Sequence, residues 1–230
     1  MAINIEKVDV FGWQAAIRGL RNPLNSWDKS DSELCKGADG FEDCTINVTG
    51  ECPRHNDFRH DIFCIGPNDH SLMIKLRNAG TDHRKFMRMI MVSFDITAPL
   101  YWWKEYDTYK VATVANSCST MHKIHEKEFT MDDFSHEHLL TGSMFQLHRT
   151  VDLLNEAREE YLKTKDKVYW WQMIQLLPSS YNQKRTVMLN YEVLANIYKS
   201  RKNHKLDEWH TFCEWIESLP YSELITGVEG

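Results

Sequence analysis

One segment constrains the possible folds of this chain more than any other. Residues 86–97 alternate with a period of two, and both faces of the segment are mostly apolar. This pattern predicts a strand at the centre of a sheet. Pro99 ends the strand, because proline has no N–H to donate to a neighbouring strand. One face carries Phe86, Arg88, Ile90, Val92, Phe94 and Ile96, and the other carries Met87, Met89, Met91 and Ser93.

Helical patterns account for most of the remaining periodic sequence. Within residues 134–164, apolar side chains recur every three or four positions from Met144 to Tyr161. One clear strand and several helices predict a mixed α/β (α+β) fold, whose N-terminal half supplies further strands. The expected helices are residues 71–78, 100–109, the stripe within 134–164, and residues 168–177, 186–199 and 207–219.

Composition limits the class of protein. With 230 residues, 42% hydrophobic and 26% charged, we expect a single globular domain over residues 1–230. No apolar run approaches the about 20 residues that a membrane-spanning helix needs, so we expect no membrane segment. The N-terminus has no basic stretch followed by an apolar one, which predicts a cytoplasmic protein. The net charge of −6 argues against non-specific binding of nucleic acid.

Aromatic residues are abundant, at 12% of the chain. They indicate either a core rich in large side chains or a surface on which a flat ligand stacks. A core is the commoner reason for such an excess, so we expect most of these rings to be buried.

Residues 35–65 form an irregular, cysteine-rich insertion. Cys35, Cys44, Cys52 and Cys64 lie there together with His55 and His60, but no pair of cysteines has the close spacing typical of zinc sites. Reduced thiols are the favoured interpretation, and we expect no metal site. Zinc ligation and disulfides are the two alternatives.

A run of hydroxyl and amide side chains follows the aromatic segment. Thr113, Asn116, Ser119 and Thr120 lie in it, and Lys110 precedes it. Small polar residues donate hydrogen bonds to phosphate or carbonyl oxygens, so the run is typical of an anion or nucleotide site. It is equally typical of a capped turn at the start of a helix.

Three polar residues near the C-terminus, Asn190, Asn196 and Arg201, are candidates for a site. If residues 186–199 and the following turn are helical, Asn190 and Arg201 share a face, because eleven positions turn a helix through about 1100°, roughly 20° beyond three full turns. The alternative is a solvated arginine and a capping asparagine. If this arginine is buried it needs a partner, and Glu192 is the obvious one nearby.

Taken together, these segments resemble the flavin-dependent thymidylate synthases over residues 66–215. The strand that ends at Ala98-Pro99 and its aromatic helix are similar to the family's strand that leads into its signature. That signature is Arg-His-Arg, two residues, Ser, one residue, Asn, two residues, Ser, one residue, Arg. Lys110 and Thr113 stand for its Arg and Ser, and Asn116 and Ser119 for its Asn and Ser after one extra residue.

The third matching stretch is the most specific. Leu177-Pro178 is followed by Asn190, Asn196 and Arg201, which match the family's flavin-binding asparagines and substrate-activating arginine without a gap. The sequence departs from the family at four positions: Tyr109 replaces the signature His, Met121 its last Arg, Glu192 an Arg after the first Asn, and Ile174 an Arg before Leu-Pro.

The resemblance implies a twisted, mostly antiparallel sheet with flanking helices, and a homotetramer whose sites are built from several subunits. It implies reductive methylation of dUMP to dTMP with FAD, NAD(P)H and methylenetetrahydrofolate. Arg201 would be catalytic and would bind substrate with Ser119, Thr120 and Glu105. The expected cofactor-binding residues are Asn190, Asn196, His83, Lys110, Thr113 and Asn116.

Three other functions stay open. The departures from the family pattern suit a related flavin enzyme that adds a one-carbon group to another pyrimidine nucleotide. They also suit a non-catalytic nucleotide-binding assembly protein that keeps the scaffold. The last alternative hypothesis is a zinc-binding regulator that uses Cys35–Cys64.

Overall fold

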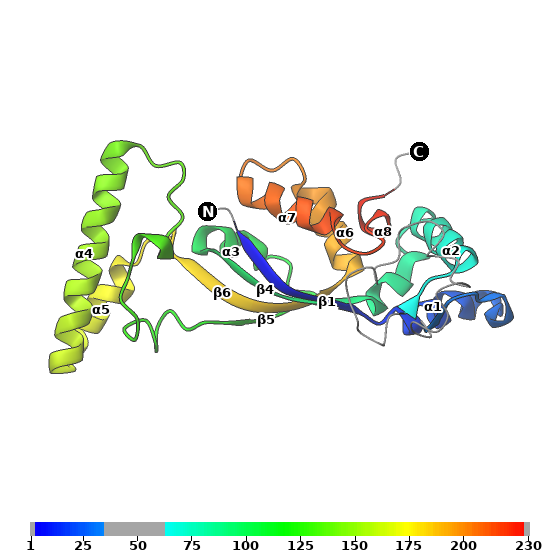
Figure 1. Cartoon of the computed structure of the whole chain (residues 1–230), viewed down its shortest axis with the longest axis horizontal. Coiled ribbons are helices and arrows are strands. Elements are labelled where there is room, and N and C mark those ends of the chain that lie inside the picture. The colour runs from blue at the N-terminus through cyan, green and yellow to red at the C-terminus, as the bar shows by residue number, and fades with distance from the viewer. Residues whose placement is uncertain (1–2, 35–62, 228–230) are drawn as a thin grey trace, which may run out of the picture. The chain divides into compact units, whose positions relative to one another are not determined.

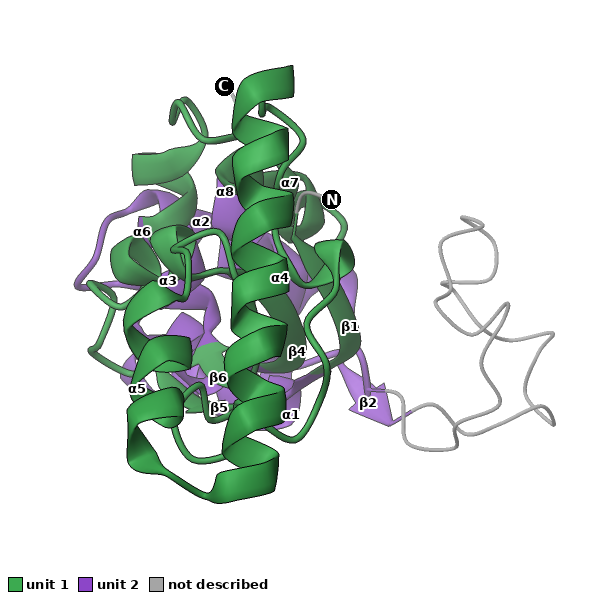
Figure 2. Ribbon diagram, turned by 90° about the vertical axis from the view of Figure 1, so that its left-hand side faces the viewer, with its two compact units in different colours: residues 1–9, 93–189, 197–218 green, residues 10–92, 190–196, 219–230 purple. Residues whose placement is uncertain are grey.

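A computed structural model describes residues 3–34 and 63–227 of the chain. The residues group into two compact units (Figure 2). The expectation of one domain over residues 1–230 stays a prediction. Unit 1 holds residues 1–9, 93–189 and 197–218, and unit 2 holds residues 10–92, 190–196 and 219–230.

The central element is a four-stranded sheet in the order β1-β4-β6-β5 (Figure 1), most of which belongs to unit 1. The edge strand β5 is antiparallel to β6, with Val114 opposite Met188 and Ser117 opposite Arg185. The predicted class, a mixed α/β fold with an antiparallel sheet and flanking helices, is confirmed. The strands are β1 (Asn4–Phe11), β4 (Met91–Pro99), β5 (Val114–Ser117) and β6 (Asn182–Asn190).

The predicted central strand exists, but its start was wrong. β4 has neighbours on both sides and buried residues on both faces, as its pattern indicates. It begins at Met91, because the preceding residues form the 3-10 helix η6 (Arg84–Met89). Phe86, Met87 and Ile90 are the buried residues there. Their spacing of three and four is helical, and the alternating sequence conceals it.

Aromatic rings from two helices fill the core of unit 1. Trp102, Trp103 and Tyr106 come from α3 (Leu100–Tyr106) and are at most 1% exposed. The Trp102 ring lies 4.7 Å from that of Trp209 on α7 (Asp207–Glu217). The expectation that most of the aromatic excess is buried holds for this cluster. Because each ring removes a large apolar area from water, it contributes strongly to stability.

A helix pair, α4 (Thr141–Thr164) and α5 (Lys167–Leu176), forms a second core in unit 1. Figures 1 and 2 show the two helices side by side. The predicted apolar stripe is confirmed from Leu147 to Ala157, and it packs against Met173 of α5. The Asp166 carboxylate accepts a hydrogen bond from Val168 N and so caps α5. The helix starts at residue 141 rather than within 134–140.

The helix predicted over residues 186–199 is wrong in its first part. β6 runs to Asn190, and α6 (Tyr191–Arg201) begins directly after it. Val187 and Leu189 are fully buried while Thr186 and Met188 are exposed, so the burial alternates with a period of two. A short apolar run of this kind suits a strand or a helix equally in sequence.

In unit 2 a buried ion pair holds three segments together. The Asp69 carboxylate is fully buried and lies 2.5 Å from Arg21 Nε at the end of α1. Its other oxygen accepts hydrogen bonds from the hydroxyls of Ser30 and Ser32. The elements of this unit are α1 (Trp13–Arg21), η1 (Asn22–Leu24), η2 (Trp27–Lys29), β2 (Glu33–Leu34), β3 (Phe63–Cys64), α2 (Pro67–Asn78), η6 and α8 (Glu223–Thr226).

We expect Asp69→Asn to lower the free energy of unfolding by about 3–5 kcal/mol, because it leaves the Arg21 guanidinium buried without a counter-charge. Asp82→Asn, an exposed carboxylate in the same unit, is the matched control and should change stability by less than about 0.5 kcal/mol. Denaturant unfolding measures both. Equal stabilities of the two variants would contradict the anchoring role.

The same carboxylate makes stability depend on pH. Burial raises the pKa of Asp69, but hydrogen bonds from Ser32, Ser30 and Arg21 outweigh it, so the pKa lies below its usual value. A lowered native pKa contributes stability above the unfolded-state pKa, and that stability is lost as the pH falls through the native value. The Asp69→Asn variant should therefore unfold with a weaker pH dependence in acid than the parent.

Candidate functional site

Arg201 ends α6 and is held in unit 1 by three groups. Its Nη1 donates to Oε2 of Glu105 at 2.6 Å, and its Nε donates to the Tyr109 hydroxyl at 2.9 Å. The guanidinium also lies over the Trp209 ring, 4.7 Å from its centroid. Its partner is thus Glu105 on α3. The expectation that Glu192 pairs with Arg201 was wrong, since Glu192 binds a different arginine.

The Glu105 carboxylate is the meeting point of this network. Besides Arg201, its Oε2 accepts a hydrogen bond from Trp209 Nε1 at 3.2 Å and lies 3.2 Å from His204 Nε2. Within the described residues, no donor contacts Oε1 of Glu105, and no acceptor contacts Nη2 of Arg201. One acceptor and one donor therefore stay available to a ligand.

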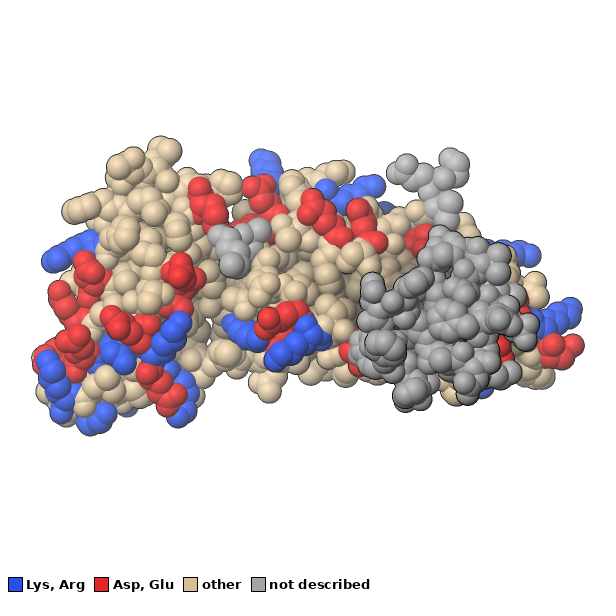
Figure 3. All heavy atoms as spheres, in the orientation of Figure 1, with Lys and Arg blue, Asp and Glu red and all other residues tan. Residues whose placement is uncertain are grey.

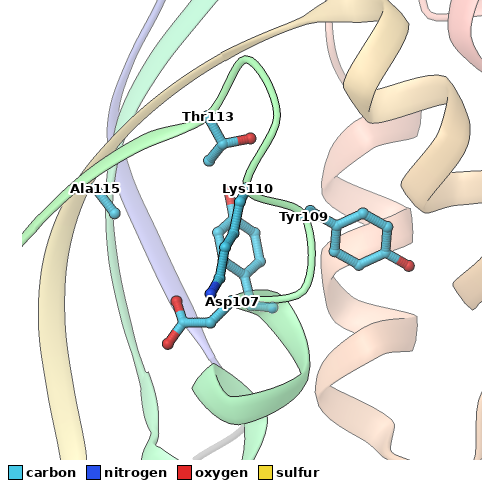
Figure 4. Close-up of a pocket in the computed structure, with 6 residues that line it drawn as sticks. Asp107, Tyr109, Lys110, Thr113 and Ala115 are labelled. Carbon is cyan, nitrogen blue, oxygen red and sulfur yellow. The ribbon is translucent and has the colours of Figure 1, made fainter.

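A cavity of about 230 Å³ lies next to this network in unit 1 (Figure 4). It is bounded by the end of α3, by β5 and by the turn between them. In that turn Ala112 has φ +56°, a left-handed conformation that is strained for a residue with a Cβ. In Figure 4 the Tyr109 ring points away from the side chains of Lys110 and Asp107. The lining residues are Tyr106, Asp107, Tyr109, Lys110, Thr113 and Ala115.

Two hydroxyls of the cavity-lining residues lack partners. Tyr106 Oη and Thr113 Oγ1 are both buried, and neither makes a hydrogen bond to the described part of the chain. Burial, followed by the charge of Asp107, raises the pKa of Tyr106, so this hydroxyl keeps its proton and can donate. A buried polar group without a partner costs about 1–3 kcal/mol. A ligand with acceptor oxygens would remove that cost.

The hydroxyl-rich run forms an edge strand and a turn rather than the start of a helix. Asn116 is exposed on β5, opposite Thr186 of β6. Ser119 Oγ accepts hydrogen bonds from the backbone N–H groups of Met121 and His122, so it caps a turn as the alternative interpretation expects. Its hydroxyl hydrogen is left to donate. Lys110 is exposed, and Thr120 is half-buried beside this turn.

Unit 2 carries the other predicted residues. Asn190 is not on a helix with Arg201, which corrects the geometry expected from the sequence. It is the last residue of β6, and its Oδ1 accepts a hydrogen bond from Val193 N at the start of α6. Asn196 is exposed on α6, and its Oδ1 accepts from Arg84 Nη2 at 3.4 Å. His83 is exposed directly before η6.

The structure gathers some of the predicted residues into two groups, and His83, Asn116, Ser119 and Thr120 lie in neither. Glu105 and Arg201 are in direct contact in unit 1, and Lys110 and Thr113 line the adjacent cavity. Asn190 and Asn196 flank the first half of α6 in unit 2. Sequence reasoning missed Arg84, Tyr106 and Trp209 as members of these groups. No periodicity marks them, because each acts through a contact distant in sequence.

The described residues contain no group of three or more His, Cys, Asp or Glu side chains placed to hold a metal ion. Cys118 and Cys213 have free thiols. Most of the cysteine-rich segment, including Cys35, Cys44, Cys52, His55 and His60, lies outside the described residues, so its zinc and disulfide interpretations stay predictions. Over the described ranges, every helix is too short or too polar to cross a bilayer.

Comparison with known proteins gives one clear result. No family model and no curated protein matches the sequence. Solved structures do match. Two structures of the Helicobacter pylori flavin-dependent thymidylate synthase ThyX with FAD and dUMP align over 98% of both chains, with a TM-score of 0.63 and 15% identity. The fold is that of the flavin-dependent thymidylate synthases.

A third structure extends the likeness. The UMP/dUMP methylase PolB from Streptomyces cacaoi, bound with 5-Br dUMP, aligns over 94% of this chain and 88% of its own, with a TM-score of 0.53 and 13% identity. At such identities the comparison shows the fold alone.

The unpartnered hydroxyl of Thr113 gives a prediction that separates binding from stability. Thr113→Val replaces a hydroxyl without a partner by a methyl group of similar size, so the melting temperature of the free protein should stay equal or rise. Affinity for a uracil nucleotide or FAD should fall, by about fivefold or more. Thermal unfolding and titration calorimetry measure the two effects.

Thr150→Val is the matched control. Thr150 is also buried, but its hydroxyl donates to the Gln146 carbonyl within α4. This variant should lose about 1 kcal/mol of stability and keep its ligand affinity. A Thr113→Val variant that is destabilised with unchanged affinity for both ligands would show that its hydroxyl serves the fold.

Proposed function

We propose that this chain is a flavin-dependent thymidylate synthase, which methylates C5 of dUMP to give dTMP. FAD is the cofactor, methylenetetrahydrofolate the carbon donor and NAD(P)H the reductant. The observation that carries the proposal is the likeness, over 98% of both chains, to an enzyme crystallised with FAD and dUMP. The Arg201–Glu105 network and the adjacent polar cavity supply chemistry that suits such ligands.

The side chains present are compatible with FAD. Asn190 and Asn196 each use their amide oxygen within the protein, which leaves their N–H₂ groups as donors. The buried hydroxyls of Tyr106 and Thr113 and the ammonium of Lys110 add further donors. FAD offers ring carbonyls, ring nitrogens and phosphate oxygens as acceptors. When bound, the flavin supplies the redox and one-carbon-transfer chemistry, and the protein binds and orients the reactants.

Arg201 is the proposed catalytic residue. Its Nη2 is available to a carbonyl oxygen of the uracil ring, where negative charge grows as C5 reacts. Glu105 and Tyr109 hold the guanidinium fixed, so little reorganisation accompanies that charge. Oε1 of Glu105 offers an acceptor for an N–H of the same ring. An adjacent donor and acceptor of this kind match the uracil edge that carries a carbonyl next to an N–H.

The residues of the β5 region are proposed to hold the polar parts of the ligands. Ser119 and Thr120 donate to the nucleotide, and Thr113, Asn116 and Lys110 donate to the cofactor. Lys110 acts as a point charge toward phosphate, with less directionality than an arginine. His83 is the remaining proposed flavin contact, in unit 2.

A second candidate function is methylation of another uracil nucleotide. The likeness to a UMP/dUMP methylase favours it. So do Tyr109, Met121, Glu192 and Ile174, which stand where the thymidylate synthase pattern has charged or imidazole side chains. The two candidates share the flavin and the uracil ring and differ in the sugar.

Turnover of dUMP tests the proposal directly. We expect the purified protein to be yellow, or to become yellow with FAD, and to release tritium from C5-tritiated dUMP when supplied with methylenetetrahydrofolate and NADPH. It should also restore growth to a thymidine-requiring bacterial strain. Tritiated UMP distinguishes the second candidate. A colourless protein without FAD binding at micromolar concentration contradicts both.

Removal of the Arg201 guanidinium should abolish turnover and leave FAD bound. Loss of a preorganised electrostatic contact costs about 2.7–4 kcal/mol, so kcat for Arg201→Ala should fall about a hundred- to a thousandfold. Arg201→Lys should rescue poorly, because a single ammonium cannot reproduce the planar, forked arrangement of donors that a guanidinium presents. Steady-state kinetics and flavin absorbance measure both properties.

Lys199→Ala is the control, since Lys199 is an exposed cation on the same helix. Its kcat should equal that of the parent. If Arg201→Ala instead loses flavin, or unfolds with turnover per folded molecule unchanged, then the arginine is structural and the catalytic assignment is wrong.

We also propose that the protein is a homotetramer. Large apolar side chains are exposed at the N-terminal end of α4 and on α5, including Leu140 (81%), Phe145 (74%) and Trp171 (44%). On the face drawn in Figure 3, this end of the α4–α5 pair shows no charged side chains, whereas basic and acidic groups mix at its other end. Exposed apolar surface of this kind is typical of an interaction site.

Light scattering should therefore give a mass four times that of the chain. Leu140→Asp combined with Phe145→Asp should give a smaller assembly, because charged side chains would have to be desolvated at the interface. Lys163→Asp, at the charged end of α4, is the control. A monomeric mass of the unchanged protein with full activity would contradict the proposal.

A further inference from the structure

An ion pair in unit 2 holds an arginine beside one of the asparagines proposed to bind flavin. Arg84 Nη2 donates to Oε1 of Glu192 at 3.1 Å, and Arg84 Nε lies 2.9 Å from Oε2. The two side chains are only 15% and 9% exposed. The contact of Nη2 with Oε1 is a hydrogen bond, whereas Nε and Oε2 form an ion pair without hydrogen-bond geometry. Because both side chains are shielded from solvent, the attraction between their charges is little screened. Glu192 therefore fixes the position of Arg84.

The fixed guanidinium in turn sets the amide of Asn196. Arg84 Nη2 donates to Asn196 Oδ1 at 3.4 Å. A guanidinium has donors and no acceptor, so the asparagine must turn its oxygen toward it and its N–H₂ group away. The amide of Asn190 is oriented in the same way, because its oxygen accepts from the backbone N–H of Val193. Both asparagines thus present donors, and the ligand atoms they meet must be acceptors.

The ion pair between Arg84 and Glu192 also changes the charge next to Asn196. Glu192 places a carboxylate in the first turn of α6. An unpaired carboxylate there would repel a ligand that carries phosphates. Arg84, which comes from η6, cancels that charge and places a cation next to Asn196.

We propose that Arg84 is a positioning residue of the cofactor site: it holds Asn196 as a hydrogen-bond donor, and Glu192 holds Arg84. The inference rests on the proposed flavin-binding role of Asn196. It adds two residues, Arg84 and Glu192, that act together and without which the Asn196 amide is free to rotate.

A double-mutant cycle on FAD affinity tests the inference. We expect Asn196→Ala and Arg84→Ala each to raise the FAD dissociation constant about tenfold, and the double variant to be no weaker than Asn196→Ala alone. Losses that multiply to about a hundredfold would overturn the proposal, since Arg84 would then act independently of Asn196. Arg88→Ala, an exposed arginine of the same 3-10 helix, is the matched control and should bind FAD as the parent does.

Two further variants keep the test decisive if Arg84→Ala folds poorly. Asn196→Asp keeps an oxygen for Arg84, replaces the N–H₂ donor by an acceptor and adds a negative charge, so it should stay folded and lose FAD affinity by about tenfold or more. Arg84→Lys keeps the positive charge but lacks the planar fork, so it should stay folded and lose part of the affinity. Full FAD affinity in either variant would contradict the inference.

A measurement without cofactor separates this inference from the proposed function. In the free protein, ¹⁵N relaxation should show the Asn196 side-chain amide as ordered, and Arg84→Ala should make it mobile while Arg88→Ala leaves it unchanged. An amide equally mobile in all three proteins would overturn the positioning role. Absence of FAD binding to the unchanged protein would contradict the proposed function and leave the relaxation result to decide the positioning.

Discussion

The contact between Glu105 and Arg201 is the interaction on which the proposed site of unit 1 depends. Glu105 lies on α3 and receives Arg201 from α6 and the Trp209 indole from α7. The Glu105 carboxylate thus connects α3, α6 and α7, and it lies beside a core of packed aromatic rings. Because such rings and their helices are rigid, the guanidinium is held before any ligand arrives. Preorganised charge is what makes an electrostatic contribution to catalysis effective.

The sequence predicted the long periodic helices and strands correctly, but it did not predict the residues at which one element ends and the next begins. The β4 strand, the α4 stripe and α7 follow from patterns that one element satisfies over many residues. The β6–α6 junction at Asn190 was missed because a four-residue apolar alternation suits either type of element. For the same reason 84–89, which looks like the start of a strand, is a 3-10 helix. Tertiary packing decides such cases.

The sequence indicated candidate residues of the site by their identity, and it did not indicate the contacts that these residues make. The resemblance named Arg201, Asn190 and Asn196, but no sequence pattern indicates that Arg201 pairs with Glu105 or that Glu192 pairs with Arg84. Both pairs join residues about a hundred positions apart. The spacing of residues along a chain predicts which of them are neighbours within one helix or strand. It does not predict which residues, distant in sequence, come into contact when the chain folds.

Asn190 ends a strand, caps a helix and keeps an amide N–H₂ group for a ligand. Four residue types cap helices well: Asn, Asp, Ser and Thr. Aspartate has no donor, and the hydroxyls of serine and threonine are shorter, so asparagine alone meets all three demands. If Asn190 binds the cofactor as proposed, position 190 should be invariant among natural variants of this chain. A laboratory library randomised at this codon would return one amino acid under selection for both folding and cofactor binding.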